Sequence, residues 1–285
     1  MTLSCPFRAW RYLLSLDSPS PFGLPESLAR RCLDVSEWLG PILHCHEVTK
    51  LYAVGDGLFA LANVEFEVEE GQFVVITGPS GSGKTTLLNI LGGIDRPTHG
   101  EVILKGRKYS RMSEDDLALL RRRDLGMVFQ FFNLIPELTA AENIGFPMRL
   151  LGWDEKRVLE RLAFLMDAVG LADRANHYPL ELSGGEQQRV AIARSLAVKP
   201  SVVLADEPTG NLDSAKSREV MELMAKFNRE ERQTFVVVTH ERAFEDYADV
   251  VVRLSDGKAV ERRVMGGDSR HEAEDSRTSC PVTPS

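Results

Sequence analysis

The middle of the chain carries two kinds of hydrophobic repeat. In residues 64–69, apolar residues alternate with glutamates, which is the period of a strand exposed on one side. Three short runs, Phe73–Thr77, 202–205 and 235–238, are almost wholly apolar, as expected for strands buried on both faces. Residues 158–169 instead keep their apolar residues on one face of a helix. Strands that alternate with helices predict an α/β fold with a mostly parallel sheet.

Turn and helix-breaking residues separate these elements and indicate further ones. Gly170 is placed to end the helix over 158–169. Residues 137–182 contain no strand-like run, so we expect a helical insertion there. Further predictions are a helix over 220–227, a hairpin over 100–109, and strands over 250–254 and 258–260 joined by a turn at Asp256 and Gly257.

The two ends of the chain differ from this central region. Residues 1–44 contain five prolines and no lysine, and they predict a poorly ordered extension or a start assigned too early. Arginines within 7–16 argue against a secretory signal there, and a short amphipathic helix on a membrane surface is the alternative. Residues 265–285 are polar and predict a disordered tail. We therefore expect one folded domain over 45–264.

Composition excludes several classes of function. The chain has 42 acidic and 34 basic residues, a net charge of −8, which does not favour binding to nucleic acid. The three arginines at 121–123 are interpreted as the solvated end of a helix. No apolar run approaches the roughly 18 residues that a membrane-spanning helix needs.

The four cysteines, Cys5, Cys32, Cys45 and Cys280, make no disulfide framework and favour a reducing compartment. Cys45 stands between His44 and His46, which raises the question of a metal site. Adjacent side chains of a strand point to opposite faces, and the sequence shows no second ligand cluster. The expectation is therefore that these three residues bind no metal.

A phosphate-binding loop follows the run Phe73–Thr77 and precedes an apolar helical segment. The strand–loop–helix setting and the pattern G-x-x-x-x-G-K-[ST] both fit a nucleotide site. Backbone N–H groups of such a loop surround phosphate oxygens, Lys84 adds a positive charge, and the Thr85 hydroxyl is placed to bind Mg²⁺. The candidate residues are Gly78, Pro79, Ser80, Gly81, Ser82, Gly83, Lys84, Thr85 and Thr86.

Two carboxylates follow the apolar run 202–205. The carboxyl end of a strand is where an open α/β sheet places its ligands. We expect Asp206 to enter the Mg²⁺ shell, as in the Walker B element of P-loop proteins, and Glu207 to accept a hydrogen bond from an attacking water.

The segment Leu182–Gln187 narrows the class of phosphate-binding-loop protein to which the chain can belong. Ser183 and Glu186 form a capping box, and Gly184 and Gly185 leave backbone N–H groups open to a phosphate. Here the chain resembles the ATP-binding cassette (ABC) ATPases, whose signature is LSGGQ or a close variant. The resemblance covers about residues 46–264. It implies a P-loop NTPase of RecA-like core with a mixed sheet, an antiparallel β subdomain and an α-helical subdomain at about 137–200.

The resemblance also implies roles for other residues. Gln130 matches the glutamine that reaches Mg²⁺ and the water, His240 matches the switch histidine at the γ-phosphate, and Asp213 matches the D-loop at the dimer interface. Tyr52 matches the aromatic residue that stacks on adenine, with Phe59 as the alternative. In this family the signature faces ATP held by a second copy, so a head-to-tail homodimer around two ATP is implied.

Within the family, residues 130–144, 182–196 and 204–213 look most like the group that serves lipoprotein release, macrolide-type efflux and cell division. The resemblance implies an ATPase on the cytoplasmic face of the inner membrane that drives a separately encoded permease. The alternative is an ABC-type ATPase in a non-transport role, such as cell division or remodelling of nucleic acid or ribosomes.

Overall fold

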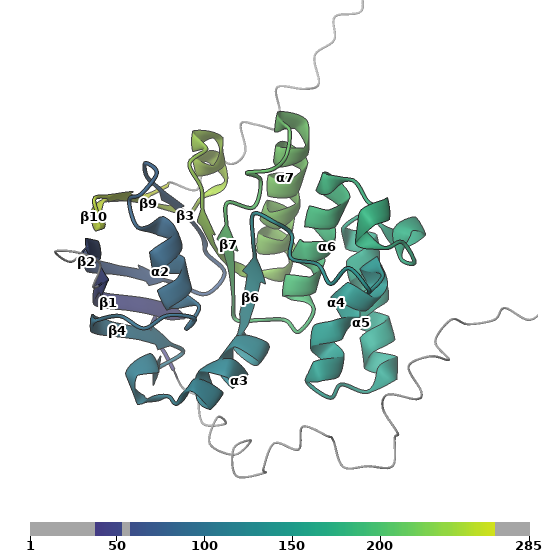
Figure 1. Ribbon diagram of the computed structural model, residues 1–285, viewed down its shortest axis with the longest axis horizontal. Helices are drawn as coiled ribbons and strands as arrows, with labels where there is room; N and C mark the ends of the chain where they lie inside the picture. The colour runs from purple at the N-terminus through teal and green to yellow at the C-terminus, as the bar shows by residue number, and fades with distance from the viewer. Residues whose placement is uncertain (1–37, 53–57, 266–285) are drawn as a thin grey trace, which may run out of the picture. The chain divides into compact units, whose positions relative to one another are not determined.

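A computed structural model describes residues 38–52 and 58–265, and a six-stranded mixed sheet lies at its centre (Figure 1). The strand order is β10-β9-β3-β8-β7-β6, and every neighbouring pair is parallel except β10 with β9. The mostly parallel sheet is thus confirmed. The strands are β3 (Phe73–Thr77), β6 (Leu125–Val128), β7 (Val202–Asp206), β8 (Thr234–Val238), β9 (Val250–Ser255) and β10 (Lys258–Val264).

A smaller antiparallel sheet has the order β2-β1-β4-β5. A bulge interrupts the pairing of its first two strands, since Cys45 faces Phe66 and Val48 faces Val64, which leaves His46 and Glu47 opposite the single residue Glu65. The strands are β1 (Leu43–Tyr52), β2 (Leu58–Val68), β4 (His99–Leu104) and β5 (Arg107–Lys108), of which the last two form the predicted hairpin.

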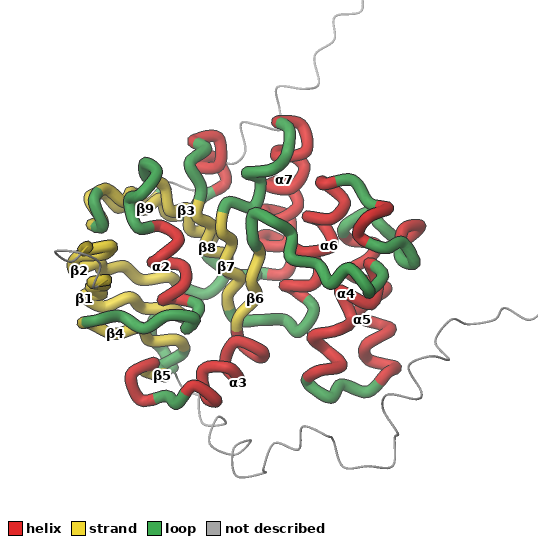
Figure 2. The backbone as a smooth tube through the Cα atoms, viewed as in Figure 1, coloured by secondary structure: helices red, strands yellow, loops and turns green. Residues whose placement is uncertain are grey.

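Helices cover both sheets (Figure 2). The predicted helical insertion is confirmed, and the left-handed Gly170 follows the end of its second helix as expected. The three arginines 121–123 lie in the last turn of α3, also as expected. The helices are α2 (Lys84–Leu91), α3 (Glu114–Asp124), α4 (Ala140–Leu150), α5 (Glu155–Ala168), α6 (Gly184–Leu196) and α7 (Ser214–Glu231), with short 3₁₀ turns η2 (Tyr109–Arg111), η3 (Ala172–Arg174), η4 (Pro179–Glu181) and η5 (Arg242–Tyr247).

Two hydrophobic cores lie on opposite faces of the mixed sheet. Val74 and Ile76 of β3 pack toward α2 and the antiparallel sheet. Phe73 and Val75 of the same strand pack toward α4, α5, α6 and α7. Because successive side chains of a strand alternate, a wholly apolar strand supplies both cores at once. This explains why β3, β7 and β8 read as continuous apolar runs.

The ends of the expected domain can be compared with the described elements. The strand β1 begins at Leu43, two residues before the predicted domain start, and β10 ends at Val264, where the domain was expected to end. The predicted extension (apart from its last residues) and tail lie outside the described residues. Within the described ranges, no helix combines the length and apolar character needed to cross a bilayer.

The question of a metal site at residues 44–46 takes a different form in the structure. Cys45 is buried and points away from its neighbours, as expected of a strand. However, His44 and His46 share the outer face of β1, and a carboxylate oxygen of Glu65 lies near both imidazoles. The sequence argument considered adjacent residues only, and it had no means of seeing which residue of β2 the bulge places beside them.

Candidate nucleotide site

The phosphate-binding loop joins β3 to α2, and close packing requires glycine at its end. Gly83 has a φ of +96°, and a Cβ built on it would lie 2.3 Å from the carbonyl oxygen of Ala60. The next residue, Lys84, is buried, and its Nζ donates to the carbonyl oxygens of Gly78 (2.9 Å) and Pro79 (3.0 Å). The ammonium group is therefore held inside the curl of the loop, where a phosphate chain would be neutralised.

A second polar atom of the loop is also available to a ligand. The Ser82 side chain is only 3% exposed, and its Oγ makes no hydrogen bond within the described residues. A buried hydroxyl without a partner carries an energetic cost unless a ligand or water satisfies it. Ser82 thus fits a loop built to surround phosphate oxygens.

Thr85 and Asp206 bring two hard oxygen donors together beside this loop. The Thr85 Oγ1 donates to Asp206 Oδ1 at 3.4 Å, although the residues belong to α2 and to the carboxyl end of β7. Burial raises the pKa of Asp206; the hydrogen bond from Thr85 opposes this, and the charge of Glu207 adds to it. Carboxylate and hydroxyl oxygens are the donors that Mg²⁺ prefers, so this pair fits that ion.

Glu207 and His240 form a second polar pair at the same edge of the sheet. The Nδ1–H of His240 donates to Glu207 Oε2 at 2.7 Å. Glu207 adopts a φ of +45°, an unusual conformation for a side-chain-bearing residue, and its backbone N–H donates to the carbonyl oxygen of Val238 at 2.9 Å. The turn after β7 is thereby tied to the end of β8, which sets the carboxylate beside the imidazole.

Gln130 reaches this edge from the end of β6. Its side-chain amide lies against Gly210, where an added Cβ would come within 2.9 Å of Nε2. The backbone carbonyl of Gln130 accepts a hydrogen bond from Asn211 Nδ2 at 2.9 Å. The loop that follows β6 and the loop that follows Glu207 are therefore locked together.

Sequence reasoning missed a residue that connects these loops. Gln188 of α6 is fully buried, and its Nε2 donates to the carbonyl oxygens of Pro208 and Phe129. Those carbonyls belong to the loops that carry Glu207 and Gln130. A polar residue on the buried face of an otherwise apolar helix was the available signal, and it became informative only with the fold known.

The signature segment begins α6 with the predicted capping box. Ser183 N–H donates to Glu186 Oε2 at 2.8 Å, and Glu186 N–H donates to Ser183 Oγ at 3.4 Å. The hydrogen bonds from the Ser183 side chain and backbone lower the pKa of Glu186. Gly185 packs so closely on α7 that an added Cβ would lie 3.1 Å from the Lys216 side chain.

The remaining two candidates occupy different surroundings. Asp213 caps α7 by accepting a hydrogen bond from Lys216 N–H at 3.0 Å. Tyr52 lies at the end of β1, where its hydroxyl donates to Asp95 Oδ2 at 2.8 Å and Lys50 Nζ lies 4.9 Å from the ring centroid. The alternative aromatic residue, Phe59, is 62% exposed on β2.

Apart from Asp213 and Tyr52, the candidate residues thus form two separate groups. The loop of α2, Asp206, Glu207, Gln130 and His240 gather where β6, β7 and β8 end. The signature begins α6, on the other side of the mixed sheet from α2 (Figure 1). One chain therefore presents a cradle for a phosphate chain and, elsewhere, a helix N-terminus able to face one.

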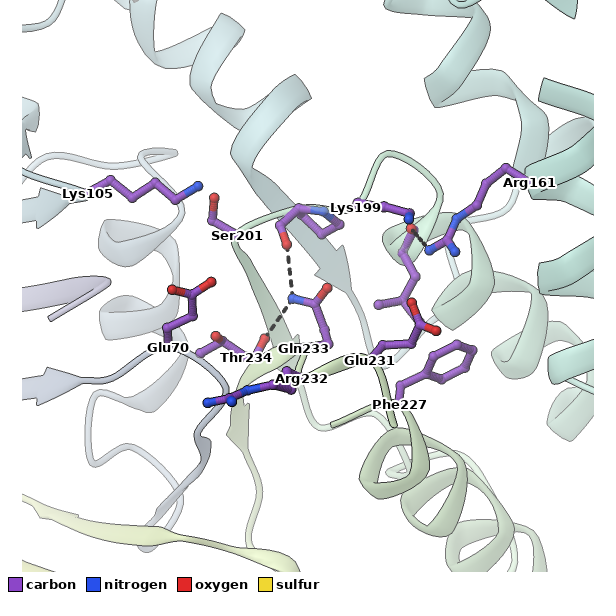
Figure 3. A pocket seen from close by; sticks show the side chains of 12 residues that line it. Glu70, Lys105, Arg161, Lys199, Ser201, Phe227, Glu231, Arg232, Gln233 and Thr234 are labelled. Carbon is purple, nitrogen blue, oxygen red and sulfur yellow. Dashed lines mark hydrogen bonds between the residues drawn. The ribbon is translucent and has the colours of Figure 1, made fainter. Parts of the chain in front are cut away.

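A pocket of about 270 Å³ lies away from both groups (Figure 3). Its lining includes Ser201 and Thr234, which stand where β7 and β8 begin, whereas Asp206 and His240 stand where these strands end. Gln233 spans its wall by donating to the carbonyl oxygens of Pro200 and Thr234. The pocket is therefore at the opposite edge of the sheet from the nucleotide site.

This combination of loop, paired carboxylates and capped signature helix defines a P-loop ATPase of the cassette type. A family model described as ABC transporter matches residues 61–210, and the chain belongs to that family. The matched region contains the phosphate-binding loop, the signature and Glu207. The protein is thus an ATP-binding, ATP-hydrolysing cassette, which confirms the class of enzyme that the sequence predicted.

Relatives and solved structures agree with this assignment. An ABC transporter ATP-binding protein of Methanocaldococcus jannaschii is 49% identical over 221 residues, covering 77% of this chain and 98% of the relative. The lipoprotein-releasing system ATP-binding protein LolD of Aquifex aeolicus is 47% identical over 222 residues, covering 78% and 97%. The dimeric, post-hydrolysis structure of the cassette MJ0796 with ADP and Pi matches with a TM-score of 0.72 at 42% identity, covering 79% and 99%. The expected fold class is confirmed.

Proposed function

We propose that two copies of this chain close around two ATP molecules and drive a separate membrane permease of the lipoprotein-release or efflux type. The observation that carries the proposal is the separation of the two phosphate-facing groups on one chain. Lys84 begins α2 and Ser183 caps α6, and these two helices pack against opposite faces of the mixed sheet. A site that needs both must take one from each of two copies.

The cradle on one chain would hold ATP through the loop backbone and Lys84. Thr85, Asp206 and the Gln130 amide oxygen would hold Mg²⁺ beside it. Bound there, Mg²⁺ would neutralise charge on the phosphate oxygens. Lys84 contributes a buried positive charge at the same place, so both the lysine and the metal ion would neutralise the phosphate chain.

Hydrolysis requires a water placed in line with the terminal phosphate. The Glu207 carboxylate would accept a hydrogen bond from that water and polarise it, and His240 would hold this carboxylate in orientation through the 2.7 Å contact. The His240 side chain is 60% exposed, which leaves its imidazole able to approach a phosphate. Phosphoryl transfer needs mainly positioning of this kind.

The dimer proposal is tested by measuring the mass of the protein in solution with and without ATP. Glu207→Gln should bind ATP without hydrolysing it, and light scattering should then show twice the 31.7 kDa chain mass only when ATP is present. Adding Ser183→Arg should return this variant to the monomer mass while binding of a fluorescent ATP analogue persists. A monomer mass for Glu207→Gln in excess ATP would overturn the head-to-tail scheme.

Coupling to a permease is supported by an exposed aromatic residue beside Gln130. Phe131 is 71% exposed, whereas Leu134 in the same loop packs against the core. A large apolar side chain held outward next to a catalytic glutamine suits contact with a membrane partner. The relatives named LolD belong to lipoprotein-releasing systems, and we propose that this chain likewise lies on the cytoplasmic face of the membrane as a peripheral subunit.

The permease proposal has its own experiment. A co-expressed permease with few membrane spans and a large extracytoplasmic domain should co-purify with the chain in detergent and change its ATPase rate. Phe131→Asp should weaken this association, and Val260→Asp, at a 56% exposed apolar residue of β10, serves as the matched control. Equal association of the two variants would overturn the role of Phe131.

A further inference from the structure

The outer face of the antiparallel sheet carries a cluster of metal-binding side chains that the ATPase does not use. His44 and His46 stand two residues apart on β1, so their imidazoles project from the same face. Their ring centroids lie 5.4 Å apart. Glu65 of β2 adds a carboxylate, and one ligand atom from each of the three side chains lies within 4.8 Å of the others.

The bulge in β1 creates this arrangement. It places both His46 and Glu47 opposite Glu65, with Glu47 in the left-handed region at a φ of +48°. The extra residue brings His46 Nδ1 to 3.4 Å from Glu65 Oε1. This matches the separation of about 3.4 Å expected for two ligands of one tetrahedral zinc ion with bonds of roughly 2.1 Å.

His44 completes the set beside the same carboxylate oxygen. Its Nε2 lies 4.0 Å from Glu65 Oε1 and 3.7 Å from Glu67 Oε1, and this nitrogen is shielded from solvent without making a hydrogen bond within the described residues. These separations are too long for hydrogen bonds and leave room for an ion between the groups. The side chain of His44 is 21% exposed, so an ion bound there would be partly enclosed.

The neighbouring residues define which atoms can act as ligands. Cys45 points into the core, where its Sγ lies 3.6 Å from the carbonyl oxygen of Val64, so the thiol is no candidate. Glu101 faces His46 from β4, but its carboxylate accepts hydrogen bonds from Ser110. Glu67 faces His44 and is free to add negative charge or a fourth ligand.

We propose that His44, His46 and Glu65 form a binding site for a divalent transition metal, with zinc as the matching ion. Two imidazole nitrogens and one carboxylate oxygen are a common zinc donor set, and they suit zinc better than magnesium or calcium. The bound ion would join β1 to β2 at the start of the domain. The site is separate from the ATP site, because Tyr52 stands six positions further along β1 than His46, roughly 20 Å of strand.

The test is a zinc titration of the full chain, free of nucleotide, against a chromophoric chelator. Wild-type protein should bind one equivalent that Mg-ATP does not displace. His46→Ala and Glu65→Gln should each weaken it at least about 10-fold. His99→Ala, an exposed histidine on β4 of the same sheet, and Glu69→Gln, just after β2, are the matched controls and should bind as wild type.

Two further readouts separate this site from any zinc bound near His240. Cobalt at the proposed site should give the visible absorption of a tetrahedral ion, and His46→Ala should lose it. Zinc should also raise the Tm of wild-type protein but not of His46→Ala, since an ion that binds only folded protein stabilises it. Unchanged affinity in His46→Ala, or displacement of zinc by Mg-ATP, would overturn the proposal. ATPase activity should be equal in all these variants, which distinguishes failure here from failure of the proposed transport function.

Discussion

The Glu207 carboxylate and the His240 imidazole lie 2.7 Å apart although 33 residues separate them in the chain. Parallel pairing of β7 with β8 explains this, because Asp206 is in register with Val238 and both strands end at the same edge. The contact is therefore built by strand register, and any change that shifts β7 against β8 should disturb it. It is the arrangement on which the first prediction depends.

Replacing Glu207 with glutamine should lower the ATPase rate by about 10²–10⁴-fold, the usual contribution of a positioned acid–base group. The amide keeps the shape and can still bond to His240, so ATP binding should be unchanged. Phosphate release measures the rate, and a fluorescent ATP analogue measures binding. Undiminished turnover would contradict the role given to Glu207.

Replacing Lys84 with alanine should abolish tight binding of ATP, because it removes the buried ammonium inside the loop. Lys258→Ala, an exposed lysine at the start of β10, is the matched control and should bind ATP normally. Equilibrium titration with a fluorescent analogue compares the two. Equal affinities would show that Lys84 does not contact the phosphates.

Replacing Asp206 with asparagine should raise the Tm of nucleotide-free protein at neutral pH while lowering ATPase activity by about 10²-fold or more. Folding raises the pKa of Asp206, mainly through burial. The ionised carboxylate therefore makes folding less favourable at every pH above the pKa of the unfolded state, and the full penalty is present above the pKa of the folded state. The gain in Tm should disappear as the pH falls below about 4, where the carboxyl is protonated in both states. Melting curves of both proteins between pH 3 and 8 test whether the difference in Tm is positive at neutral pH and vanishes in acid.

Ser183→Ala should cost about 1 kcal/mol of folding free energy through loss of the capping box on α6. Ser113→Ala removes an equivalent box from α3 and should cost a similar amount. Only the first change should weaken the ATP-dependent dimer of Glu207→Gln, since only Ser183 is proposed to face a phosphate. If both variants dimerise alike, Ser183 acts as a cap alone.

Gly83→Ala should destabilise the fold by about 3 kcal/mol or more and prevent ATP binding. The added Cβ meets the Ala60 carbonyl at 2.3 Å, and the positive φ adds strain. Gly81→Ala shares a positive φ, +78°, but has open space around it, so a cost of about 1–2 kcal/mol is expected. Urea unfolding of both variants measures the difference.

Much of the fold followed from the sequence because its central strands are apolar on both faces. Residues such as Val74 and Val75 serve different cores, and no amphipathic helix tolerates such a run. The P-loop and its neighbours could be placed because strand, glycine loop and helix occur in a fixed order around Lys84. These signals are local, and local signals are what a single sequence carries.

The features that escaped prediction depend on register between distant segments. The hydrogen-bond partner of Tyr52 is Asp95, 43 residues further along the chain, and no pattern in the sequence around Tyr52 indicates this contact. The cluster of His44, His46 and Glu65 depends on one bulge residue in β1. A shift of one residue in a strand reverses its faces, so such contacts require the pairing to be known first.

The position of Gln188 has a mechanical consequence. This side chain belongs to the signature helix α6, and it donates hydrogen bonds to the backbone next to Gln130 and next to Glu207. If α6 tilts toward a second copy, the backbones at Phe129 and Pro208 must move with it, or the two hydrogen bonds from Gln188 must break. In the proposed dimer, docking of the second copy on α6 would therefore also move the loops that carry Gln130 and Glu207.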